Sequence, residues 1–163
     1  MKFFLFLFDR GENLAGGIYG TILVTSIVAA SDTSLTIWRS LSIVTVTIGV
    51  FWLAHVYAGL LAWSIESDEP ISYRQVRQFA FREWPLLQAV VVPALALVAG
   101  GIGLIEYRTA YAIAIGYGAA SLIWWGLLYA RNEHLGRRAT LVVVLVNALF
   151  GLGIVVLKWF VGH

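Results

Sequence analysis

Residues 111–130 read YAIAIGYGAASLIWWGLLYA, a stretch without a charged residue or a proline. A helix needs about 20 predominantly apolar residues to cross the hydrocarbon core of a bilayer, so this stretch is long enough to span a membrane. The composition agrees, because 60% of the 163 residues are hydrophobic and only 12% are charged. A soluble domain of this size needs more charge to cover its surface. The sequence therefore predicts an integral membrane protein.

Five apolar stretches of spanning length follow one another along the chain, and charged residues bound each of them. They lie at about 13–31, 39–64, 85–105, 109–130 and 139–161. Only Glu106, Tyr107 and Arg108 separate the third span from the fourth, so we expect these two to be antiparallel neighbours. We expect one all-α transmembrane domain, residues 1–163, built as a bundle of about five helices.

Lys and Arg are distributed unequally between the two sides of this bundle. One side has eight of the 11, namely Lys2, Arg10, Arg74, Arg77, Arg82, Arg131, Arg137 and Arg138. The other side has Arg39, Arg108 and Lys158. This bias predicts a multi-pass protein of the cell (cytoplasmic) membrane with its N-terminus in the cytoplasm and its C-terminus outside. Nucleic acid is not an expected partner, because no soluble basic face is present to bind it.

The segment between the second and third spans predicts an interfacial cytoplasmic helix at about 70–83. Pro70 follows Asp68 and Glu69, which favours the start of a helix. Apolar side chains fall near one face and Arg74 and Arg77 lie off it, as in a helix that rests among anionic headgroups. A solvated connector with one apolar side explains the same residues nearly as well.

Residues 115–118, Ile-Gly-Tyr-Gly, are similar to the carbonyl-lined filter of potassium channels. Such a filter is an extended loop, whereas nothing in the surrounding span ends a helix. We therefore interpret these residues as helical and their glycines as packing positions. Small residues at four-residue spacing predict close helix contacts. The predicted packing residues are Gly16, Gly20, Ala112, Gly116, Ala120, Asn147 and Gly151.

The first span has a stripe of polar and small residues, Asn13, Gly17, Thr21 and Thr25, at four-residue spacing. Polar side chains inside a membrane often mark ion paths, so the stripe is either one wall of a wetted path or a tight interface. Threonine hydroxyls also bond to carbonyls of their own helix, which requires no function. His55 of the second span should lie level with residues 19–21 of the first. It could carry or sense a proton behind the stripe, or it could be a neutral histidine bonded to a neighbouring Thr or Tyr.

Residues 10–24, RGENLAGGIYGTILV, resemble the opening helix of the lysosomal and bacterial leak potassium channel family, which carries R-x-x-x-F-S-D followed by G-V-F-A-I. Arg10 and Glu12 match the start of that pattern, and residues 17–19 look like G-V-F. Residues 51–57, FWLAHVY, are similar to the family's F-W-x-x-H. The F-S-D element is replaced at residues 14–16, and the family's repeat has six spans. The resemblance implies that the first helix lines the pore of an oligomer.

Together these features predict a homo-oligomeric ion channel-like or ion-permeation protein in the lipid bilayer, with a monovalent cation as its ion. The alternative is a non-conducting accessory or assembly subunit of a larger membrane complex, which small-residue seams suit equally well. We do not expect an enzyme, because no span interior contains Asp or Glu and the three histidines are far apart. The chain has no cysteine, and we expect neither a metal site nor a cofactor.

Overall fold

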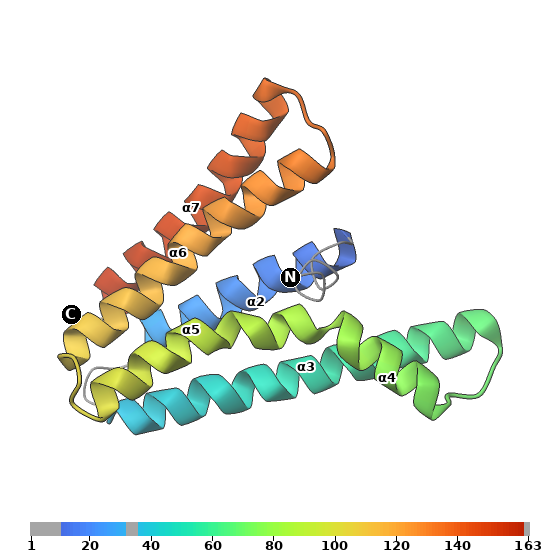
Figure 1. Cartoon of the computed structure of the whole chain (residues 1–163), viewed down its shortest axis with the longest axis horizontal. Coiled ribbons are helices and arrows are strands. Elements are labelled where there is room, and N and C mark those ends of the chain that lie inside the picture. Colours follow the sequence, from blue (N-terminus) through green and yellow to red (C-terminus); the bar gives the residue numbers. More distant parts are fainter. Residues whose placement is uncertain (1–10, 32–35, 162–163) are drawn as a thin grey trace.

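The computed structural model describes residues 11–31 and 36–161, apart from the side chains of residues 11–13, 157, 158 and 161. Within these ranges all regular structure is helical (Figure 1). The helices are α2 (Gly11–Ala30), α3 (Ile37–Ser67), α4 (Tyr73–Arg82), α5 (Trp84–Gly101), α6 (Tyr107–Asn132) and α7 (Arg137–Val161). Four of the described helices, α3, α5, α6 and α7, are long and apolar enough to cross a membrane, and the apolar part of α2, Leu14–Ala30, is shorter. The expectation of an all-α chain with helices of spanning length is confirmed for the described residues, with four such helices where five spans were predicted.

Glycines end α5 earlier than the predicted span, at Gly101. The chain then turns through Gly103, whose φ of 77° is left-handed and favours glycine. α6 begins at Tyr107 and runs back beside α5. A Cβ built on Gly100 would lie 2.7 Å from the Cβ of Ala110, so the two helices approach closely at this turn. They are neighbours, as their short connection predicts.

α2 lies at the centre of the bundle, between α5 and α6, and it also contacts α3 and α7 (Figure 1). Val24 and Val28 are fully buried on it. Gly20 lets α5 approach, since a Cβ built there would lie 3.1 Å from the Cβ of Ala89 and from the backbone of Leu86. Close packing over small residues holds helices together where lipid is as apolar as the side chains.

The seam of small residues that packs inside the chain is a different one from the predicted seam of α6. Ala112, Gly116 and Ala120 are exposed, and nothing lies within 4 Å of a Cβ built on Gly116. The inward seam has the same four-residue spacing but is shifted by two positions. Its buried residues are Ala110, Ala114, Gly118, Leu122, Gly126 and Ala130. Residues 115–118 are helical, as predicted.

The bundle is closed at one end and open at the other. At the closed end the buried Tyr111 hydroxyl of α6 donates a hydrogen bond of 2.6 Å to Ser40 Oγ of α3. Toward the other end, the α6–α7 hairpin diverges from α3 and α5, with α2 between the two arms (Figure 1). α4 and the turn between α6 and α7 both lie at this open end, so their arginines share one end of the bundle. The predicted topology requires this arrangement.

α3 is much longer than its neighbour α5. Its 31 residues extend about 46 Å, whereas the 18 residues of α5 extend about 27 Å. α4 packs against the part of α3 that continues past the start of α5. Phe79 of α4 is buried there, and a Cβ built on Gly59 of α3 would lie 2.8 Å from its ring. The Trp52 indole N–H donates to the Ala80 carbonyl at 3.3 Å.

Gly118→Ala tests the contact between α2 and α6. A Cβ at Gly118 would lie 2.8 Å from the Cβ of Thr25, and overpacking of this kind costs about 1–3 kcal/mol. Gly116→Ala makes the same chemical change on the same helix in open space. We expect the first variant to unfold at a lower temperature than the second in detergent. Equal midpoints for the two variants would rule out this contact.

Candidate functional site

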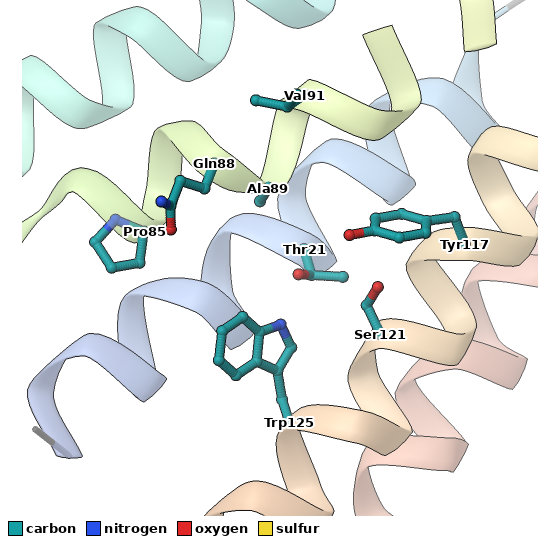
Figure 2. Close-up of a pocket in the computed structure, with 8 residues that line it drawn as sticks. All are labelled: Thr21, Pro85, Gln88, Ala89, Val91, Tyr117, Ser121 and Trp125. Carbon is teal, nitrogen blue, oxygen red and sulfur yellow. The ribbon is translucent and has the colours of Figure 1, made fainter. Parts of the chain in front are cut away.

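A cavity of about 280 Å³ lies between α2, α5 and α6. Its lining comes from the middle of α2, the first half of α5 and the part of α6 between Tyr117 and Trp125. We call this cavity the three-helix pocket (Figure 2). Its lining residues are Thr21, Pro85, Gln88, Ala89, Val91, Tyr117, Ser121 and Trp125.

Most of the lining side chains carry a polar group, although all come from apolar helices. The Thr21 hydroxyl donates to the Gly17 carbonyl at 2.7 Å, so its hydrogen is used within α2 and its oxygen can still accept. In the described part of the chain, Gln88, Tyr117 and Ser121 have no hydrogen-bond partner. Unpaired polar groups at membrane depth are costly. Water or a polar ligand in the pocket would offset this cost.

The α6 wall of the pocket arises from a regular spacing. Tyr117, Ser121 and Trp125 recur every four residues and therefore share one face of the helix. Figure 2 shows the Tyr117 hydroxyl directed toward α2 and the Trp125 ring reaching toward the same helix. Gly17 makes room for that ring, because a Cβ built there would lie 2.7 Å from Trp125 Cζ2. Larger residues at Gly17 would displace this wall.

Among the stripe residues on α2 whose side chains are described, Thr21 alone lines the pocket. Gly17 is covered by Trp125, and Thr25 is buried with its hydroxyl bonded to the Thr21 carbonyl at 2.6 Å. The Asn13 side chain lies outside the described residues. The described part of the stripe thus faces α6 of the same chain, because Gly118 admits Thr25. An axis between copies along this stripe would require α6 to move away.

His55 lies beside α2 at the predicted level but does not line the pocket. Its ring centroid is 5.3 Å from that of Tyr19, and its Nδ1 is 2.9 Å from the Phe51 carbonyl oxygen. The ring nitrogen therefore bonds within its own helix, while the neighbouring helix supplies an aromatic contact. The predicted role of His55 in proton sensing stays a prediction.

The other predicted packing residues lie at helix contacts, except on α6. Gly16 and Gly20 face α5, and Gly151 faces Ala119. The Asn147 Nδ2 donates to the Val143 carbonyl of its own helix at 3.0 Å. It is buried against Gly126, so its contribution to the interface is one of shape.

Sequence reasoning missed the α6 wall of the pocket. The spacing of Tyr117, Ser121 and Trp125 was the signal that could have revealed it. Their polarity is masked by the apolar residues around them, and Tyr and Trp are also common in lipid-facing belts. Gln88 stands out more clearly, as a polar residue inside an apolar span.

The pocket offers hydroxyl and amide groups that can accept or donate hydrogen bonds or coordinate a weakly held cation. Within the described residues, no group of three or more His, Cys, Asp or Glu is placed to hold a metal ion. None of the described carboxylates lines the pocket. Its chemistry is that of reversible polar contact.

Comparison with known proteins found no match to this chain among protein-family models, curated proteins or solved structures. The resemblance to leak potassium channels therefore stays a prediction.

Cysteine substitution tests whether water reaches the pocket, because the natural chain has no cysteine. We expect Ser121→Cys to react with a small charged methanethiosulfonate at least about tenfold faster than Ala120→Cys, since thiols react as thiolates, which form in water and not in hydrocarbon. Ala120 is adjacent but exposed on the outward face of α6, where lipid would cover it. Similar labelling rates in proteoliposomes would mean that the pocket is dry.

Proposed function

We propose that this chain is an ion-permeation protein of the cytoplasmic membrane, and that the three-helix pocket is the entrance for a small monovalent cation. The observation that carries the proposal is a set of side chains, Gln88, Tyr117 and Ser121, that have no hydrogen-bond partner among the described residues and line a cavity between apolar helices. Polar groups at membrane depth are expensive and usually functional. Their oxygens could replace part of the hydration shell of an ion.

The shape of the bundle supports a path that is entered from one side. The pocket lies toward the end where α6 and α7 diverge from α5, whereas Tyr111 and Ser40 close the other end. Neutral oxygens suit a monovalent ion, while divalent cations favour carboxylates, and the described lining of this pocket contains none. A complete path would then require the closed end to open.

Self-association is part of the proposal, and it would involve α6. α2 is surrounded by the other helices of its own bundle. It would therefore contribute Thr21 to the path within one chain and would not line a pore on an axis between copies. The outward residues Ala112, Gly116 and Ala120 would allow a helix of a second copy to approach closely.

The same outward seam supports a second candidate function, that of an accessory subunit. A helix of a different membrane protein could pack over Gly116 as well as a second copy could. Purification from native membranes under mild conditions separates the two candidates. A stoichiometric unrelated protein would favour the subunit, and a self-oligomer would favour permeation.

Flux from potassium-loaded liposomes that contain only this protein tests the proposed function. We expect Gln88→Leu to lower the flux about tenfold, the change for an amide that stabilises the ion by about 1.4 kcal/mol. Gln78→Leu makes the same change at an exposed site on α4 and should leave the flux unchanged.

Two results would count against this proposal in different ways. Absence of wild-type flux across a range of pH and voltage would exclude permeation by the protein alone. Equal flux from wild type and Gln88→Leu would remove the pocket from the path.

A further inference from the structure

We infer that the outward face of α4 binds the headgroups of anionic phospholipids, with Arg74 and Arg77 contacting lipid phosphate. We define the α4 face as Tyr73, Arg74, Arg77 and Phe81, which are all exposed. The inference does not depend on the proposed permeation.

The opposite side of α4 is fixed to α3, so the helix presents a constant face outward. Phe79 is buried against Gly59, and the Trp52 indole bonds the Ala80 carbonyl. Arg82 is held near this contact, with its guanidinium 4.5 Å from the centre of the Phe79 ring and its Nε 3.3 Å from Glu83 Oε1. Arg82 is therefore committed to the protein.

The two arginines of the α4 face are available to a phosphate. Within the described residues, neither Arg74 nor Arg77 forms an ion pair with a carboxylate. The Arg77 guanidinium lies 5.6 Å from the centre of the Phe81 ring, which leaves its outward edge open to a ligand. Guanidinium groups bind phosphate through paired hydrogen bonds.

Aromatic side chains on the same face favour a lipid surface over another polyanion. Tyr73 is 82% exposed and Phe81 55% exposed, and both flank the arginines. Exposed aromatic rings of this kind are typical of the level of lipid headgroups, and basic residues beside them attract anionic lipid. The α4 face thus combines the two chemistries that a bilayer surface offers.

The order of charged residues from the end of α3 to the start of α5 also supports binding to a lipid surface. The acidic residues Glu66, Asp68 and Glu69 cluster at the far end of α3 and the turn before α4. The arginines follow on α4, and Trp84 begins the apolar α5. The 10 residues of α4 extend about 15 Å, so this order places the carboxylates at one end, Tyr73 and the two arginines of the α4 face next, and Phe81 and Trp84 nearest the start of the apolar α5. Acidic residues in water and arginines at the level of the lipid phosphates fit a bilayer surface.

Native mass spectrometry of the protein released from bilayers of equal phosphatidylcholine and phosphatidylglycerol tests the inference. We expect Arg74→Gln/Arg77→Gln to retain at least about threefold less phosphatidylglycerol than wild type, because two guanidinium–phosphate contacts are lost. Retention of phosphatidylcholine should not change. The matched control is Arg137→Gln/Arg138→Gln, which removes the same charge from the exposed start of α7 and should retain the wild-type amount.

Four outcomes would overturn the inference. Phosphatidylglycerol could be retained equally by the α4 variant, or lost equally from the control, which would indicate diffuse charge only. A change in oligomer mass of the α4 variant in phosphatidylcholine alone would instead make this face a contact between copies. If the double variant does not fold, wild-type protein gives the answer: 0.5 M salt screens exposed charges and should release the bound phosphatidylglycerol, and unchanged retention refutes the inference.

Discussion

Where α2 meets α6, a glycine of each helix packs against a larger side chain of the other. The rest of the bundle depends on this contact. Gly17 of α2 admits Trp125 of α6, and one end of the same interface reverses the roles, with Gly118 of α6 admitting Thr25 of α2. In a bilayer no hydrophobic gain drives such contacts, so fit between surfaces must supply the stability. Because α2 also contacts α3, α5 and α7, this fit sets the position of the central helix against all its neighbours.

The position of the central helix decides which polar groups remain exposed to the pocket. Thr21 and Thr25 direct their hydrogens to carbonyls one turn earlier, so these two hydroxyls are paired within α2. Gln88, Tyr117 and Ser121 have no such partner in the described chain and line the same cavity. Polar groups in lipid need hydrogen-bond partners, and the bundle contains two arrangements of them. The two threonine hydroxyls are paired within their own helix, whereas water or a ligand in the pocket would pair the other groups.

Hydropathy and charge were sufficient to predict where the helices lie along the chain. They could not predict which face of each helix packs inside the bundle. The first residue of each predicted span lies within two residues of the first residue of a helix, because charged residues and glycines mark the ends. On α6, however, both the 110–114–118 series and the 112–116–120 series are small. Lipid and protein interior are both apolar, so nothing in the sequence distinguishes the inward series from the outward one. For the same reason, only part of the pocket could be predicted from the sequence. Thr21 and Gln88 are polar in any context, whereas Tyr117 and Trp125 also suit a lipid-facing surface.

The unequal lengths of α3 and α5 make the shape of the bundle sensitive to the bilayer itself. α3 extends about 46 Å, longer than a hydrocarbon core of about 30 Å, so with its acidic end in water a tilt would fit its apolar part to the bilayer. A thicker membrane would reward a more upright α3, and we expect the two arms of the bundle to draw together as acyl chains lengthen. Spin-label distances between α4 and the α6–α7 turn in short- and long-chain nanodiscs would measure this, and a constant distance would show a rigid frame. The thickness of the lipid bilayer would then control the separation of the two arms of the bundle.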